Sequence, residues 1–283
     1  MGIKFRLIVM NFLQYAIWGS WLISLGAYLG GGLDFTGLQI GSFFATMGVA
    51  SLFMPAVMGI IADRWIPAQK LLGICHLVSG GFLIAAASQT AYGPLYSCML
   101  LSVMFYMPTI ALSNSVAYNA LDLARLDTVK HFPPIRVWGT VGFIAAMWFV
   151  DLTHIGGVQI KLTEWQLYVS AVLSFLLAVY SFSLPGCPVD RTVKARSWVD
   201  TLGLRAFTLF KEKRMAIFFV FSMLLGAALQ ITNAFGDSYI QSFGSMPQYA
   251  DSAIVKHSVI LLSLSQMSET FCILLIPFFL RRF

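Results

Sequence analysis

A single carboxylate, Glu269, lies in an otherwise uncharged apolar stretch of the sequence, residues 258–280. An apolar stretch of about 20 residues is long enough to span a bilayer as a helix. An ionisable side chain inside such a helix is costly unless it faces a cavity or a partner, so it marks a functional site by default. A carboxyl group at that depth can bind a polar solute and can carry a proton. Glu269 is therefore the first candidate for both roles.

Three carboxamide side chains accompany Glu269 at helical spacing. Gln266 precedes it by three residues, and Gln230 and Asn233 show the same spacing in the preceding apolar stretch. Residues three apart share one face of a helix, so two helices each present a polar stripe. Carboxamides both donate and accept hydrogen bonds, which suits a neutral solute rich in hydroxyls and ring heteroatoms. The alternative is that they bond neighbouring helices together.

A third stripe combines a cation, a hydroxyl and an aromatic ring. Arg136, Thr140 and Phe143 are spaced i, i+4 and i+7, and Pro133 and Pro134 should lie in the first turn of the same helix. Such a stripe can hold a polar ligand that has a flat part. In the alternative interpretation, Arg136 extends to the lipid headgroups from the start of its helix.

Gly59, Asp63 and Arg64 close the second apolar stretch and form a possible gating motif. The motif resembles the G-x-x-x-D-R/K loop of the major facilitator superfamily. Gly59 would let two helices approach closely, and Asp63 would cap a helix end or pair with a cation when the helices close. An ordinary charge pair beside the membrane is the alternative.

The composition requires these residues to be positioned by membrane-spanning helices. Hydrophobic residues make up 58% of the 283 residues, charged residues 11%, and the mean hydropathy is +0.80. We therefore expect an all-α polytopic membrane protein rather than a soluble domain. Eight spans are expected, over residues 5–29, 38–61, 70–89, 93–117, 133–152, 165–185, 214–240 and 258–280.

The cations predict the orientation of these spans. With a cytoplasmic N-terminus, 15 of the 18 Lys and Arg residues fall on the cytoplasmic side. Only Lys161 and Lys256 fall on the other side, and Arg136 lies within the fifth span. Cytoplasmic loops carry such an excess of cations. The net charge of +6 therefore reflects topology and does not indicate a nucleic-acid partner.

The spacing of the spans predicts a two-bundle carrier. Residues 1–185 would form a six-helix bundle, and 186–213 a basic cytoplasmic linker in which residues 198–210 form an amphipathic helix. Residues 214–283 would supply the first two helices of a second bundle. We expect the sequence to be truncated after Phe283, at about eight transmembrane helices.

Other polar residues in or near the spans rank second. Asn11 and Gln14 lie beside Tyr15, Trp18 and Trp21 in the first span, where aromatic rings more often serve in packing or at the membrane interface. All four histidines lie at expected span ends and are interpreted as interfacial anchors, with His257 also a possible entrance residue. Asp237, near the outer end of the seventh span, is expected to be hydrated.

The sequence offers no pattern for catalysis or for metal binding. Its four cysteines are scattered without metal-ligand spacing, and it shows no nucleophile beside a base and no phosphate-binding loop. We therefore expect no enzyme activity, no catalytic residue and no cofactor.

The sequence is similar to the bacterial nucleoside:proton symporter family of the major facilitator superfamily, over nearly its whole length. The motifs that carry this resemblance are Phe12-Leu13-Gln14, Trp18-Gly19-Ser20-Trp21, Tyr106-Met107-Pro108-Thr109, Phe132-Pro133-Pro134-Ile135-Arg136, Arg214-Met215-Ala216-Ile217-Phe218-Phe219, Ser222-Met223-Leu224-Leu225-Gly226, Gln230-Ile231-Thr232-Asn233, Ser265-Gln266, Ser268-Glu269-Thr270 and Ile276-Pro277-Phe278-Phe279-Leu280.

The resemblance implies import of nucleosides such as uridine and adenosine through the bacterial inner membrane, driven by protons. It implies that the family's substrate-binding positions correspond to Arg136, Thr140, Phe143, Gln230, Asn233, Gln266 and Glu269. Protonation of Glu269 would release Arg136 and permit the bundles to rock. A monomer in contact with membrane lipid is expected. A carrier of another solute, such as a sugar or a drug-like cation, and a non-transporting membrane fragment are the alternatives.

Overall fold

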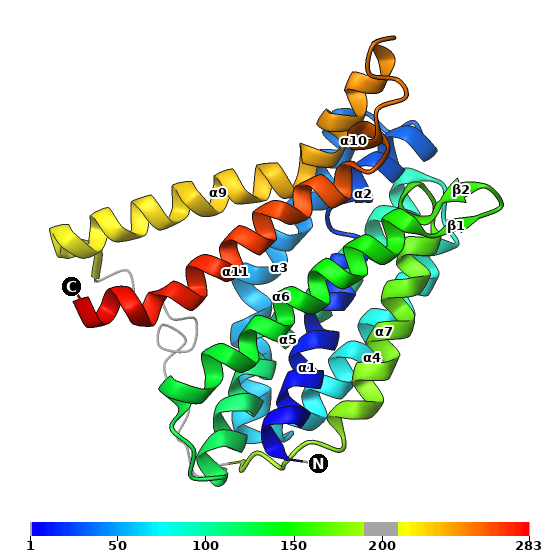
Figure 1. Ribbon diagram of the computed structural model, residues 1–283. Helices are drawn as coiled ribbons and strands as arrows, with labels where there is room; N and C mark the ends of the chain where they lie inside the picture. Colours follow the sequence, from blue (N-terminus) through cyan, green and yellow to red (C-terminus); the bar gives the residue numbers. More distant parts are fainter. Residues whose placement is uncertain (1, 190–208, 283) are drawn as a thin grey trace.

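The chain is helical along most of its length (Figure 1). The computed structural model describes residues 2–189 and 209–282. Within them, the elements of the first part are α1 (Ile3–Gly19), α2 (Leu25–Ala27), the π-helix η1 (Tyr28–Gly32), α3 (Gly37–Arg64), α4 (Ala68–Ala87), α5 (Tyr92–Leu123), α6 (Thr128–Leu152), the antiparallel hairpin β1 (His154–Ile155) and β2 (Val158–Gln159), η2 (Ile160–Leu162) and α7 (Trp165–Ser181). The second part contains α9 (Lys213–Ser242), η4 (Phe243–Ser245), α10 (Ala253–Lys256) and α11 (Ser258–Arg282).

Each of the eight expected spans is helical in the structure. Among the described residues, five helical segments are both long and apolar enough to cross a membrane, namely α3, α4, α5, α6 and Lys213–Ser245. Helix α7 is apolar and shorter, and the first span is broken after Gly19 and resumes at Leu25. The expected amphipathic helix over residues 198–210 lies almost entirely outside the described residues.

Helix α6 begins earlier than the sequence suggested. The side chain of Asp127 accepts hydrogen bonds from the backbone N–H groups of Val129 and Lys130, at 2.9 and 3.4 Å, and so caps a helix that starts at Thr128. The expectation that Pro133 and Pro134 occupy the first turn is therefore wrong. The capping aspartate sets the start of the helix, and Arg136 lies deeper along it than expected.

Glycines bring α1 and α6 into close contact. A Cβ atom on Gly19 would lie 2.3 Å from the carbonyl oxygen of Phe143, and one on Gly142 would lie 2.2 Å from that of Phe12. Only glycine fits at such separations. Membrane helices commonly pack closely through small residues of this kind. The two contacts fix the position of Phe143 relative to α1.

Helices α9 and α11 meet the α1–α7 group mainly at one end, which we call the hairpin end because it carries β1 and β2 (Figure 1). There a Cβ atom on Gly26 would lie 2.8 Å from the carbonyl oxygen of Ala234, and the rings of Phe44 and Phe235 are 5.9 Å apart. In Figure 1, α9 diverges from α3 toward the opposite end of the molecule. The contacts between the two parts are therefore concentrated at the hairpin end.

Candidate substrate-binding site between the helices

A cavity of about 160 Å³ lies between the α1–α7 group and the pair α9 and α11. It has polar and apolar walls contributed by α1, the turn after it, α6, α9 and α11. The residues that line it are Tyr15, Trp18, Leu22, Arg136, Thr140, Phe143, Leu229, Gln230, Asn233, Gln266 and Glu269. All seven residues predicted to bind substrate are among them. The structure thus brings three separate stripes of the sequence to one place, and their role in binding stays a prediction.

The wall formed by α1 and α6 is organised around a cation–aromatic contact. The guanidinium carbon of Arg136 lies 3.7 Å from the centroid of the Tyr15 ring. Gly139 lies against both, since a Cβ atom there would be 2.6 Å from the Tyr15 ring and 2.7 Å from an Arg136 nitrogen. The guanidinium is therefore held in the cavity wall by an aromatic face, an attraction that strengthens when water is excluded.

Glu269 lies on α11, where it lines the cavity and remains exposed. Within the described residues, Arg136 and Glu269 form no ion pair closer than 4 Å. The two charged groups lie on different walls of the cavity in this conformation, and the release of Arg136 by protonation of Glu269 stays a prediction. The two groups line one cavity from different helices.

Two hydrogen-bond donors in the cavity wall lack an acceptor. The indole N–H of Trp18 and the side-chain N–H₂ of Gln230 are buried and have no hydrogen-bond partner within the described part of the chain. Leaving a buried donor unpaired costs about 1–3 kcal/mol. A ligand with acceptor atoms that reaches both α1 and α9 would recover that cost.

A buried network supports the α1 wall from behind. Gln14 donates to the hydroxyl of Thr109 at 2.7 Å, and its side-chain oxygen lies 2.8 Å from Nε2 of His76. Nδ1 of His76 lies 3.2 Å from the hydroxyl of Ser174, and the hydroxyl of Tyr106 donates to the Gln14 carbonyl at 2.7 Å. The expectation that His76 is an interfacial anchor is wrong, since its side chain is fully buried. The network holds the turn of α1 that carries Tyr15 and Trp18.

Comparison with known proteins decides the family. Residues 1–283 match the family described as nucleoside H⁺ symporters. The chain belongs to this family. It is 52% identical to the xanthosine permease of Escherichia coli strain K12 and 47% identical to the nucleoside permease NupG of the same organism. Each alignment covers all of this chain and 66% of the relative, so the chain spans just under two thirds of the length of these relatives.

Solved structures agree with this family membership. The crystal structure of the nucleoside transporter NupG matches all of this chain and 68% of its own, with a TM-score of 0.86 and 47% identity. A mutant form of NupG matches with a TM-score of 0.89. The expected membrane-embedded, all-α fold of the major facilitator type and the expected family are confirmed. The named relatives are permeases and transporters.

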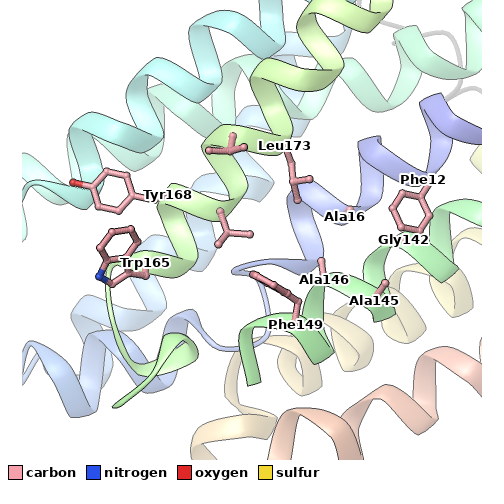
Figure 2. Close-up of a pocket in the computed structure, with 11 residues that line it drawn as sticks. Phe12, Ala16, Gly142, Ala145, Ala146, Phe149, Trp165, Tyr168 and Leu173 are labelled. Carbon is pink, nitrogen blue, oxygen red and sulfur yellow. The ribbon is translucent and has the colours of Figure 1, made fainter. Parts of the chain in front are cut away.

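A larger apolar groove lies outside this site. It measures about 440 Å³ and runs between α1, α6 and α7, as Figure 2 shows. Ala16, Gly142 and Ala145 are among its small lining residues, and Trp165 and Phe149 are among its large ones. Its lining is almost entirely apolar, whereas a site for a polar solute needs a few polar groups that fix the orientation of the ligand. The groove is therefore not the candidate site of a nucleoside symporter.

The sequence did not lead us to predict four of the residues that line the cavity as first-rank binding candidates. Tyr15 and Trp18 were given second rank, and Leu22 and Leu229 were not considered. Tyr15, Trp18 and Leu22 follow the spacing i, i+3 and i+7, and this shared face was the available signal. Asn11 and Gln14 are fully buried and do not line the cavity.

The predicted gating residues lie in the last turns of α3, away from the cavity. A Cβ atom on Gly59 would meet no atom within 4 Å among the described residues, so the expected close helix approach is not present in this conformation. Asp63 is exposed and Arg64 is partly buried. Their role in gating stays a prediction.

Asp237 differs from its expected hydrated state. Its side chain is fully buried and accepts hydrogen bonds from the hydroxyl of Ser258 and, at 2.9 Å, from the side chain of Gln241. The contact between α9 and α11 at the hairpin end excludes water from Asp237. This contact between two helices cannot be predicted from the residue pattern of either helix alone.

Proposed function

We propose that the protein carrying this chain imports nucleosides across the bacterial inner membrane by proton symport and is not an enzyme. The observation that carries the proposal is the single cavity that gathers an arginine, a hydroxyl, an aromatic ring, three carboxamides and one carboxylate between two groups of helices. The family membership and the names of the relatives support it. Substrate would move by rocking of the helix groups around this cavity.

The chemistry of the cavity suits the two parts of a nucleoside. The base would stack on Phe143 and bond the carboxamides of Gln230, Asn233 and Gln266, which can match both donors and acceptors of a ring edge. Ribose hydroxyls would pair with Thr140, Arg136 and Glu269. The binding mode uses all three polar stripes at once, so the substrate would link α6 to α9 and α11.

Proton coupling is assigned to Glu269. Its carboxylate is the one acidic group that lines the cavity within the described residues, and the residue is exposed. A proton on Glu269 would remove a charge before the helices close around the substrate. The proton is the coupling ion, and no cofactor is invoked.

The proposed topology places the N-terminus in the cytoplasm and the hairpin end outside the cell. The cation bias supports this orientation, because Lys161 and Lys256 are the two cations of the hairpin end. Residues 1–185 would form one bundle, 186–213 the cytoplasmic linker, and 214–283 helices of a second bundle. Membrane lipid surrounds the protein, which we propose to act as a monomer because the cavity lies within one chain.

Substrate binding to the purified full-length protein tests the proposal. Labelled uridine and xanthosine should bind and compete with each other, and an excess of a monosaccharide should displace neither. Variant Gln266→Leu should weaken the binding of both nucleosides. Displacement by the sugar would favour a carrier of another solute, and unaltered nucleoside binding in this variant would contradict the assignment of Gln266 to the binding site.

A further inference from the structure

A buried polar network lies behind the α1 wall of the candidate site and joins four helices. Its members, which we call the α1 support network, are Gln14 on α1, His76 on α4, Tyr106 and Thr109 on α5, and Ser174 on α7. All five are buried, and none of them lines the cavity. Ionisable side chains inside a membrane-spanning bundle are rare and mark functional sites by default. His76 is therefore a candidate for a role beyond helix packing.

The hydrogen bonds of the network run in one direction. The Thr109 hydroxyl donates its hydrogen to the carbonyl oxygen of Tyr106 at 2.5 Å, so it can only accept the 2.7 Å bond from the Gln14 side chain. The amide nitrogen of Gln14 therefore faces Thr109, and the amide oxygen faces His76. Because that oxygen cannot donate, Nε2 of His76 carries the hydrogen of the 2.8 Å bond between them. His76 thus fixes the orientation of the Gln14 side chain.

Tyr106 holds the backbone of the same turn of α1. Its hydroxyl donates to the carbonyl oxygen of Gln14 at 2.7 Å, and its ring meets the His76 ring nearly edge-on, with centroids 5.9 Å apart. Gln14 is therefore fixed at its side chain and at its carbonyl group by residues of α4 and α5. The turn of α1 that begins at Gln14 carries Tyr15 and Trp18, and both of these line the cavity.

Aromatic contacts continue from the network to the cavity. The centroid of the Tyr106 ring lies 5.9 Å from that of Trp18, and the Trp18 ring meets Phe143 edge-on at 6.4 Å between centroids. Aromatic pairs at these separations favour particular relative orientations, so each ring restrains the next. Phe143 is the ring on which the nucleoside base is proposed to stack. Trp18 therefore lies between the network and the proposed position of the base, and the direction of its unpaired indole N–H depends on how its ring is held.

We propose that Gln14, His76 and Tyr106 are positioning residues, which hold Trp18 in the orientation that binds substrate. Substrate affinity then depends on residues that do not touch the substrate. Loss of the His76 donor leaves the buried amide oxygen of Gln14 unpaired, and the turn of α1 moves to recover a partner for it. The proposal rests on the proposed function for the identity of the substrate, whereas the effect on Trp18 requires no substrate.

Fluorine NMR of Trp18 measures the positioning directly. The full-length protein is prepared with fluorotryptophan, and the Trp18 resonance is identified by its absence from Trp18→Phe. This resonance should shift or broaden in His76→Leu, which removes the donor to Gln14. It should also shift or broaden in Tyr106→Phe, which keeps the ring and removes only the hydroxyl that binds α1.

Nucleoside affinity separates positioning from general support of the fold. His76→Leu should weaken the binding of labelled uridine about fivefold, the effect of one ordinary hydrogen bond. His76→Gln should restore most of the affinity, because its side-chain nitrogen can donate to Gln14 in place of Nε2. Ser79→Ala is the matched control. It removes a buried hydrogen bond of 2.9 Å to Ser102, between α4 and α5, and should change neither the affinity nor the Trp18 resonance.

A Trp18 resonance that keeps its position and width in His76→Leu and Tyr106→Phe would overturn the proposal. Affinities equal to that of the parent in both variants would overturn it as well, as would a His76→Gln variant that binds no more tightly than His76→Leu. Tyr106→Phe decides the question where His76→Leu does not fold. A parent protein that binds no nucleoside would instead contradict the proposed function, and the fluorine resonance would still test the positioning of Trp18.

Discussion

The guanidinium of Arg136 lies over the ring of Tyr15, and the distance between the guanidinium carbon and the ring centroid is 3.7 Å. The contact ties α6 to α1 within the cavity wall. It directs the cation toward the site and away from the lipid headgroups, which favours a binding role over the membrane-interface alternative.

Loss of the Arg136 side chain should weaken nucleoside binding. We expect Arg136→Ala to cost about 2 kcal/mol, or roughly thirtyfold in affinity, as is typical of a hydrogen bond to a charged group. Equilibrium binding of labelled uridine measures it. Arg125→Ala removes the same charge from an exposed turn and should leave the affinity unchanged. Equal affinities in the two variants would support the membrane-interface role.

Glu269→Gln should uncouple transport from the proton gradient. The amide preserves size and hydrogen bonding but cannot take up a proton, so exchange of labelled for unlabelled nucleoside should persist while accumulation against a gradient disappears. Proteoliposome assays with an imposed pH gradient separate the two activities. Asp251→Asn, which neutralises a fully exposed carboxylate, is the control. Full accumulation by Glu269→Gln would assign coupling elsewhere.

Trp18→Phe tests the unpaired donor in the cavity wall. The ring packs edge-on to Phe143 at 6.4 Å between centroids, so phenylalanine keeps an aromatic ring while losing the indole N–H. If substrate accepts a hydrogen bond from that N–H, affinity should fall by about 1 kcal/mol, or roughly fivefold. Trp21→Phe, one turn further and outside the cavity lining, should have no effect on affinity. Tighter binding by Trp18→Phe would show that the donor is not used by the substrate.

Gly142→Ala should destabilise the protein and displace Phe143. Its Cβ atom would lie 2.2 Å from a backbone oxygen of α1, and such overpacking costs about 1–3 kcal/mol. Gly81→Ala is the matched control, because a Cβ atom there meets nothing within 4 Å and alanine favours a helix. Thermal unfolding in detergent should give a lower midpoint for the first variant only. An unchanged midpoint for Gly142→Ala would mean that α1 and α6 can separate without cost.

The sequence predicted the spans and the three polar stripes because both depend on local periodicity. Helical spacing places Arg136, Thr140 and Phe143 on one face wherever the helix lies, and the structure turns that face toward the cavity. The start of α6 was predicted wrongly because it depends on one N-cap residue, Asp127, whose side chain accepts a hydrogen bond from the backbone N–H of Val129.

Long-range packing decided what the sequence did not predict. His76 and Asp237 are buried because helices distant in sequence close over them, so Gln14 and Ser258 become their partners. The Asp151 and Lys161 pair depends on the hairpin that follows α6, and Tyr15 lines the cavity because α1 packs on α6. Such contacts between helices leave no periodic signal in either helix.

Uptake of labelled uridine and xanthosine by cells that lack their own nucleoside carriers tests the central claim most directly. The cells express the full-length protein, and uptake is compared with and without a protonophore. Proton-coupled import predicts accumulation that collapses when the protonophore is added and is absent from cells expressing Glu269→Gln. Accumulation that persists with the protonophore, or no uptake of either nucleoside by a well-expressed protein, would contradict it.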